Sequence, residues 1–214
     1  MTAIKICGIT NAADARQAVE LGAWALGMIF WPESARRCEL EDAEAIGSEL
    51  RRRVELAGVF VDASLDEVAR VADLCSLSLL QLHGHEGPAY CREAERRTGC
   101  KIIKAARVKD ASQIQALRPY RVDYHLLDAY SPGSPGGTGE SFNWELARTH
   151  RGPARLILSG GLTPDNVAEA VAVARPFAVD TASGTEAEPG RQDPAKVKAF
   201  FGAVAAADQR IEAA

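Results

Sequence analysis

The chain has 214 residues, of which 47% are hydrophobic and 25% charged, a composition typical of a folded globular protein. This length fits one domain, and the composition excludes a disordered tail, a collagen-like repeat and a small disulfide-linked scaffold. A net charge of -4 and a pI near 5.6 do not match the basic balance typical of a nucleic-acid-binding domain. We therefore expect no nucleic-acid partner.

The distribution of apolar residues and cysteines bears on the compartment. The start of the chain shows no apolar stretch typical of a signal peptide, and no apolar run approaches the roughly 20 residues that span a bilayer. The cysteines are odd in number and form no C-x-x-C pair, which favours free thiols in a reducing compartment. We expect a cytoplasmic protein with no membrane association. The cysteines are Cys7, Cys38, Cys75, Cys91 and Cys100.

Eight short apolar segments predict β-strands. They are rich in Val, Ile, Leu and Phe and run almost unbroken, a pattern typical of parallel strands buried on both faces. In chain order they are Ala3–Cys7, Ala25–Phe30, Glu55–Val61, Ser78–His83, Lys101–Ala105, Tyr124–Asp128, Arg155–Ser159 and Phe177–Asp180.

Amphipathic stretches between these segments predict helices. Thr10 or Asn11 can cap the first of them. Two later starts, at 163–165 and 193–194, each combine a capping side chain with a proline at the first helical position. The tail, residues 205–214, is expected to fray beyond the last helix.

The alternation of eight strands with helices predicts an α/β fold, a single compact (β/α)8 TIM barrel that spans residues 1–214. Each βα unit then has about 27 residues, fewer than in most such barrels. A doubly wound open sheet is the alternative. Its dinucleotide-binding form is disfavoured because no G-x-G-x-x-G follows the first strand. No linker divides the chain into two domains.

Residues 131–139 consist only of Gly, Pro, Ser and Thr and directly follow the predicted strand that ends at Asp128. In a barrel, the loops after the carboxyl ends of the strands build the active site. The segment is either a plain connector or a mobile lid, and we favour the lid because long loops in compact domains are often functional.

Cys7 ends the first predicted strand, and Lys5 lies two residues earlier on the same face. A nearby ammonium would lower the pKa of the cysteine from about 8.5 and favour the thiolate. Lys5 could instead pair with a carboxylate such as Asp180. Cys7 could also be a small buried hydrophobic residue, the usual role of a free cysteine.

Asp128 and Asp180 end the sixth and eighth predicted strands. A carboxylate at such a position could cap the following turn or lie at the barrel mouth as a general acid. The second role requires burial that favours the protonated form. A thiol acting as base and a carboxylic acid would together suit an isomerisation that moves protons.

Two glycine-bearing turns predict a phosphate site. Gly160 and Gly161 follow the seventh strand, and Ser183 and Gly184 follow the eighth. Barrels often bind phosphate between these two loops through backbone N–H groups, which glycine allows to approach closely. Two ordinary turns are the alternative. We expect a small phosphorylated molecule as the substrate.

Other polar residues give weaker signals. Arg36 and Arg37 follow the second strand, where a guanidinium could hold a carboxylate with two parallel hydrogen bonds. His83 and His85 lack further ligands at suitable spacing, so no metal is expected. The tryptophans are interpreted as packing residues: Trp24, Trp31 and Trp144.

An ordered set of short motifs from Lys5 to about Phe201, nearly the whole chain, resembles the phosphoribosylanthranilate isomerase family of tryptophan biosynthesis. The motifs are Lys5-Ile6-Cys7-Gly8-Ile9-Thr10, Gly58-Val59-Phe60-Val61, Gln81-Leu82-His83-Gly84, Leu127-Asp128-Ala129, Gly136-Gly137-Thr138-Gly139, Gly160-Gly161-Leu162 with Asn166-Val167, and Val179-Asp180 with Ser183-Gly184.

The resemblance implies a (β/α)8 barrel that performs an Amadori rearrangement, an aldose-to-ketose change, without metal or organic cofactor. The substrate would be N-(5-phosphoribosyl)anthranilate and the product 1-(2-carboxyphenylamino)-1-deoxyribulose 5-phosphate. By the matched motifs, Cys7 would be the general base that removes the C2 proton. Asp128 would be the general acid that protonates the furanose ring oxygen.

The resemblance also implies the binding groups. Arg36 would hold the anthranilate carboxylate, although this chain has Ser34-Ala35-Arg36 where the family usually has Ser-Pro-Arg. Asp180 would lie near the ribose hydroxyls. The phosphate would be held by backbone groups of Gly160, Gly161, Ser183 and Gly184.

Three questions stay open at this point. Another phosphosugar isomerase or epimerase barrel, or a non-catalytic barrel that binds a phosphorylated ligand, would share much of this pattern. A monomer and a homodimer both fit the composition. The sequence assigns no chemical role to His83.

Overall fold

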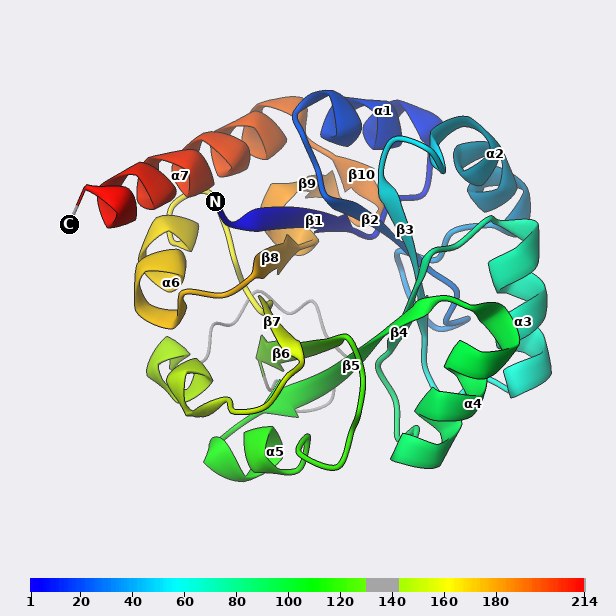
Figure 1. Cartoon of the computed structure of the whole chain (residues 1–214). Helices are drawn as coiled ribbons and strands as arrows, with labels where there is room; N and C mark the ends of the chain where they lie inside the picture. Colours follow the sequence, from blue (N-terminus) through cyan, green and yellow to red (C-terminus); the bar gives the residue numbers. More distant parts are fainter. Residues whose placement is uncertain (130–142, 214) are drawn as a thin grey trace.

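The computed structural model describes residues 1–129 and 143–213, and its eight parallel strands close into one barrel (Figure 1). Each strand pairs with the next, and β8 pairs with β1 in register from Ala3↔Ala178 to Ile6↔Thr181. The predicted (β/α)8 fold is confirmed and the open sheet is excluded. The lid predicted at residues 131–139 lies outside the described residues.

The strands begin and end close to the predicted positions. The largest difference is β5, which continues three residues beyond the predicted end at Ala105 to Val108. The barrel strands are β1 Ala3–Cys7, β2 Ala25–Ile29, β3 Glu55–Phe60, β4 Leu79–Leu82, β5 Lys101–Val108, β6 Tyr124–Ala129, β7 Arg155–Leu158 and β8 Ala178–Thr181.

Helices surround the barrel (Figure 1). They are α1 Ala12–Glu20, α2 Leu40–Leu50, α3 Leu65–Leu74, α4 Pro88–Thr98, α5 Ala111–Gln115, the 3-10 helix η1 Trp144–Thr149, α6 Val167–Ala174, the 3-10 turn η2 Ser183–Thr185 and α7 Pro194–Glu212. A short antiparallel hairpin, β9 Glu186–Glu188 and β10 Arg191–Gln192, lies between β8 and α7 and was not predicted.

The two proline-marked helix starts differ. Asp193 caps α7 as predicted, since its carboxylate accepts hydrogen bonds from two backbone N–H groups of the first turn. The start predicted at Thr163 is wrong, because α6 begins at Val167. The Asn166 side chain accepts a hydrogen bond from the Thr163 N–H at 2.8 Å and donates one to the Gly161 carbonyl at 2.9 Å, which holds this segment as a turn.

The predicted fraying of the tail is also wrong, because α7 remains helical to Glu212. Val204 and Ala207 are buried against the core. Asp208 accepts hydrogen bonds from the N–H of Thr2 at 2.6 Å and from its hydroxyl at 2.7 Å. These contacts attach the end of the chain to its beginning, a partner that local sequence does not show.

The inward-facing side chains divide the barrel interior into an apolar and a polar part. Trp24, Tyr124 and Phe177 pack ring against ring near the amino ends of the strands, with centroids 5.0–5.6 Å apart. Near the carboxyl ends, period-two alternation turns polar side chains inward. These are Lys5, Gln81, Asp128 and Asp180, all buried. The polar side chains inside the barrel that could take part in a reaction therefore lie at its carboxyl-terminal end.

A histidine pair lies on the outer side of β6. The Nδ1 atom of His125 is 2.9 Å from the Nε2 atom of His150, the residue that follows η1. Burial, reinforced by His150, lowers the pKa of His125 to about 4. Burial also lowers the pKa of His150. Both imidazoles are therefore neutral in the folded protein at neutral pH.

Because of this buried pair, the free energy of unfolding should fall in acid. Unfolded His125 takes up a proton near pH 6.5 but the folded form only near pH 4, so its contribution is complete above pH 6.5 and is lost as the pH falls to 4. The loss is about 2–3 kcal/mol. Denaturant unfolding of wild type and His125→Leu from pH 7.5 to 4 should give a shallower pH slope for the variant. Parallel curves would contradict this.

Candidate active site

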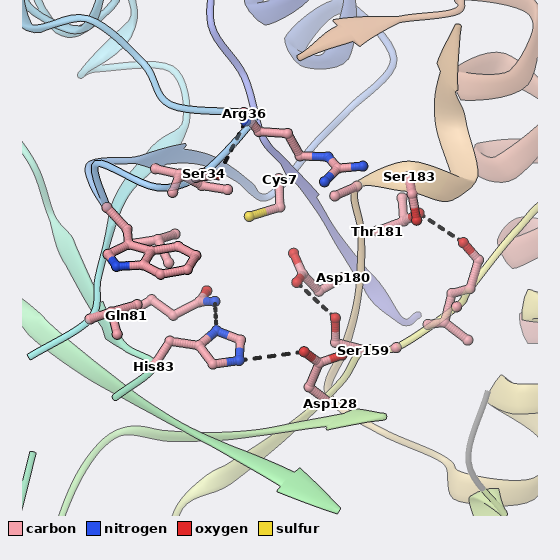
Figure 2. A pocket seen from close by; sticks show the side chains of 18 residues that line it. Cys7, Ser34, Arg36, Gln81, His83, Asp128, Ser159, Asp180, Thr181 and Ser183 are labelled. Atoms are coloured by element: carbon pink, nitrogen blue, oxygen red, sulfur yellow. Dashed lines mark hydrogen bonds and ion pairs between the residues drawn. The ribbon is translucent and has the colours of Figure 1, made fainter. Parts of the chain in front are cut away.

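A cavity opens at the carboxyl ends of the barrel strands (Figure 2). The space between its walls measures about 790 Å³, including the solvent at its open mouth. The structure brings together here all the site residues expected from sequence except Gly184. They are Cys7, Arg36, Asp128, Asp180, Gly160, Gly161 and Ser183.

The floor of the cavity holds a buried ion pair. Lys5 on β1 and Asp180 on β8 are register partners, and the Lys5 Nζ atom is 2.7 Å from Asp180 Oδ1. The Ser159 hydroxyl donates a hydrogen bond to Asp180 Oδ2 at 3.0 Å. On β2, a Cβ atom at Gly27 would come within 2.6 Å of Cys7 Sγ and 2.9 Å of Lys5 Nζ. Glycine therefore makes room for the thiol and the ammonium together.

The expectation that Lys5 brings the pKa of Cys7 below its ordinary value is wrong. Burial raises the pKa of the Cys7 thiol; Lys5 opposes this shift, Asp180 reinforces it, and the net pKa lies above its ordinary value. Burial lowers the pKa of Lys5, but Asp180 and Cys7 raise it more, and the ammonium is retained. Lys5 does approach Cys7, yet its charge is shared with Asp180. The thiol of the free protein is therefore neutral.

Asp128, at the end of β6, reaches the cavity beside two side chains from the β4 region. His83 Nε2 is 3.4 Å from Asp128 Oδ2 (Figure 2). The Gln81 amide nitrogen donates a hydrogen bond to His83 Nδ1 at 3.3 Å. Both residues belong to the motif Gln81-Leu82-His83-Gly84, but the sequence assigned no chemical role to His83 and did not predict Gln81 as a site residue. Their spacing of two residues at a strand end is the signal that could have placed both on the inner face.

Arg36 rather than Arg37 faces the cavity. The Arg36 guanidinium binds the Glu186 carboxylate through Nε and Nη2 at 2.8–2.9 Å. The Arg37 side chain is 45% exposed, and its Nε atom lies 3.7 Å from Glu39. The loop is fixed without the proline usual at position 35, because Ser34 Oγ accepts a hydrogen bond from the Arg36 N–H at 3.1 Å.

Two turns form the opposite rim. Gly160 and Gly161 both have positive φ angles, +87° and +63°, that side chains disfavour. Their backbone and that of Ser183 line the cavity, and the N–H groups of Gly161 and Ser183 bond to no residue within 1–129 or 143–213. Gly184 lies behind this rim, where a Cβ atom would collide with the Leu162 carbonyl. It therefore allows η2 to pack closely rather than lining the cavity itself.

One wall of the cavity is apolar. Ile29, Trp31, Val59 and Val61 come from the ends of β2 and β3 and from the loops that follow. Trp24 and Trp144 pack against the core as predicted, but the interpretation of Trp31 as a packing residue is wrong. Such a wall suits an aromatic ring.

Over the described ranges, the structure gathers no three His, Cys, Asp or Glu side chains that could hold a metal ion. Among the helices within those ranges, none has the length and hydropathy to cross a membrane.

Comparisons with known proteins identify the family of the chain. Residues 4–203 match the family model described as N-(5'phosphoribosyl)anthranilate (PRA) isomerase. The N-(5'-phosphoribosyl)anthranilate isomerase of Citrifermentans bemidjiense is 52% identical over 198 residues, 92% of this chain and 94% of that protein.

Solved structures give the same result. The phosphoribosyl anthranilate isomerase of Thermus thermophilus superposes with a TM-score of 0.86 at 37% identity, covering 96% of this chain and 99% of that one. A phosphoribosyl anthranilate isomerase in complex with reduced 1-(o-carboxyphenylamino)-1-deoxyribulose 5-phosphate has a TM-score of 0.83 at 38% identity, with 96% and 100% coverage. The chain belongs to the phosphoribosylanthranilate isomerase family, enzymes of tryptophan biosynthesis that interconvert an aldose and a ketose.

Proposed function

We propose that Cys7 and Asp128 are the base and acid that convert N-(5-phosphoribosyl)anthranilate to 1-(2-carboxyphenylamino)-1-deoxyribulose 5-phosphate in this protein. The observation that carries the proposal is that a thiol from β1 and a carboxyl group from β6 face one cavity. The related structure that holds the reduced product supports this ligand class.

The shape of the cavity suggests how the substrate lies. The anthranilate ring packs on the apolar wall of Ile29, Trp31 and Val59, and its carboxylate reaches Arg36. The phosphate binds at the opposite rim, where the N–H groups of Gly161 and Ser183 can donate hydrogen bonds to an anion. The ribose then lies between the two rims.

The reaction begins at Asp128. Its carboxylic acid donates a proton to the furanose ring oxygen, the bond from C1 to that oxygen breaks, and the ring oxygen becomes a hydroxyl. The lone pair of the anilino nitrogen forms a C=N bond to C1, which leaves a positive iminium. This charge acidifies the proton on C2.

Cys7 completes the proton transfer. Its thiolate removes the C2 proton, and the electron pair forms a C1=C2 bond and neutralises the nitrogen, giving an enolamine. Loss of the enol proton and protonation of C1 then give the ketone. Because burial raises the pKa of Cys7 in the free protein, the thiol must first release its proton to solvent, and the positive iminium beside Lys5 favours the thiolate that remains.

The alternative functions lead to different expectations. An epimerase of the metal-dependent type would need a histidine and aspartate ligand set, and a binding protein would not need both Cys7 and Asp128. We also predict activity without a cofactor, a cytoplasmic location and a monomeric or homodimeric state. For the last of these, a related isomerase from Thermotoga maritima is described as dimeric.

The first prediction concerns the acid and base. Cys7→Ala and Asp128→Asn should each lower kcat by about 100- to 10,000-fold, the usual contribution of a general acid or base. The assay follows anthranilate-type fluorescence with freshly generated substrate, corrected for spontaneous breakdown, with and without chelator. Cys91→Ala, the same change at a buried cysteine outside the cavity, is the control and should keep its activity.

Each outcome has a separate meaning. Folded wild-type protein without turnover would refute the isomerase assignment. Full turnover in Cys7→Ala would refute only the role of the thiol, and loss of turnover with chelator would refute the expectation of a cofactor-free reaction.

Arg36→Met should raise KM by about 10- to 100-fold, because a charge-assisted hydrogen bond contributes about 1.5–3 kcal/mol. kcat should change little, since the anthranilate carboxylate is anionic before and after the chemical step. Arg37→Met is the matched control, because Arg37 points to solvent. Steady-state kinetics of wild type and the two variants test whether Arg36 binds the substrate carboxylate. An equal KM for both variants would contradict this role.

Gly184→Ala should weaken phosphate binding without adding a group to the cavity. The new Cβ collides with the Leu162 carbonyl, so η2 must shift away from the Gly160 turn. We expect KM to rise about tenfold and stability to fall by about 1–3 kcal/mol. Gly202→Ala is the control, since nothing lies within 4 Å of its added Cβ. An unchanged KM in Gly184→Ala would argue against a phosphate site at this rim.

A further inference from the structure

We propose that His83 and Gln81 are positioning residues for Asp128: Gln81 fixes the proton of the His83 ring on Nε2, and this N–H holds Asp128 Oδ2. The resulting chain runs Gln81–His83–Asp128 across the cavity wall (Figure 2). The inference rests on the proposed role of Asp128 as the general acid. It adds two residues that act through Asp128 without forming a bond to the substrate.

The strand geometry places the three side chains together. Gln81 lies in β4 and His83 just after it, two positions apart and so on the same inner face. Asp128 is on β6, with only β5 between the two strands. All three residues line the same cavity, and Gln81 is 2% exposed. The chain is therefore buried in the wall of the active site.

The direction of the first hydrogen bond determines the tautomer. In the amide orientation of the structure, Gln81 Nε2 lies 3.3 Å from His83 Nδ1; an amide nitrogen donates, so Nδ1 accepts. A neutral imidazole that accepts at Nδ1 carries its proton on Nε2. That N–H faces Asp128 Oδ2.

The contact between His83 Nε2 and Asp128 Oδ2 is longer than a good hydrogen bond in the free protein. The Nε2 to Oδ2 distance of 3.4 Å exceeds that of a good N–H···O bond, and within the described residues His83 Nε2 makes no hydrogen bond although it is buried. When Asp128 gives its proton to the substrate, Oδ2 becomes part of a carboxylate, and a charge-assisted bond to Nε2–H is shorter and stronger. His83 therefore stabilises the state after proton donation more than the state before it.

The same contact selects which oxygen reacts. If Oδ2 faces the His83 N–H, the transferable proton is held on Oδ1, the oxygen left free for the substrate. The reverse amide orientation, with Gln81 Oε1 accepting from Nδ1–H, would turn a lone pair of Nε2 toward Asp128 and draw the proton away from the substrate. Gln81 Oε1 has no partner in the described residues, so a measurement of the tautomer separates the two arrangements.

The kinetic test uses two replacements at His83. His83→Met, which lacks a donor, should lower kcat by about 10- to 100-fold, the factor expected for one hydrogen bond to a charged group, with KM within about threefold of wild type. His83→Gln, whose amide restores an N–H at the position of Nε2, should recover most of that loss. His85→Gln is the control, because the His85 side chain is 98% exposed and bonds to Asp62 at the surface.

The test of Gln81 is a double-mutant cycle. Gln81→Met should lower kcat in the wild-type background but add nothing in His83→Met, because it acts only through the imidazole. Additive effects would overturn the chain of contacts. Unfolding temperatures of all variants show whether any loss arises from the fold.

The tautomer is measured directly on the intact protein by long-range ¹H–¹⁵N correlation of the histidine rings. The expected result is His83 protonated at Nε2, with this pattern altered in Gln81→Met; protonation at Nδ1 would overturn the proposal even if a variant fails to fold. Full kcat in His83→Met beside an inactive Asp128→Asn would overturn this inference alone. Full kcat in Asp128→Asn would instead overturn the acid role and this inference with it.

Discussion

The ion pair between Lys5 and Asp180 is the constraint on which the active site depends. Its two charges lie 2.7 Å apart with side chains 0% and 6% exposed, and removal of either would leave the other buried without an opposite charge. Cys7 shares this environment, so its protonation is coupled to both charges. Gly27 leaves room for the thiol and the ammonium, and Ser159 satisfies the second oxygen of Asp180. The floor of the cavity is thus one electrostatic unit built from β1, β2, β8 and the residue that follows β7.

The groups proposed for proton transfer and those proposed for binding come from different parts of the barrel. Strand residues carry the groups proposed for proton transfer, and their direction is set by backbone alternation and by packing below them. The binding groups come from loops and are held by contacts between distant segments. Glu186, in the hairpin after β8, orients Arg36 in the loop after β2 and also accepts a hydrogen bond from the Gly190 N–H. This hairpin therefore links Arg36, proposed to bind the carboxylate, to η2, which precedes the hairpin and is proposed to bind the phosphate.

Sequence predicted the features that depend on local patterns. Strands buried on both faces are unbroken apolar segments, and Cys7, Asp128 and Asp180 stood out as polar residues at their ends. The pairing of Arg36 with Glu186 joins residues 150 positions apart and leaves no local pattern. The raised pKa of Cys7 could not be predicted either, since it depends on burial created by the closed barrel. Trp31 was misinterpreted for the same reason, because only the three-dimensional arrangement shows which aromatic side chain lines the cavity.

The distribution of charge explains how binding and catalysis can be assigned to different parts of the cavity, the rims and the centre. The rims offer a guanidinium and backbone N–H groups, which complement the two anionic ends of the proposed substrate before and after reaction. The centre offers Asp128 and Cys7, whose deprotonated forms complement a cation that exists only once the ring has opened. Interactions that are equal in the ground and transition states lower KM, whereas those that appear with the iminium raise kcat. Lys5 already neutralises Asp180, so the negative charges that the centre adds are the Asp128 carboxylate left by proton donation and the thiolate of Cys7, and both form when the cation is present.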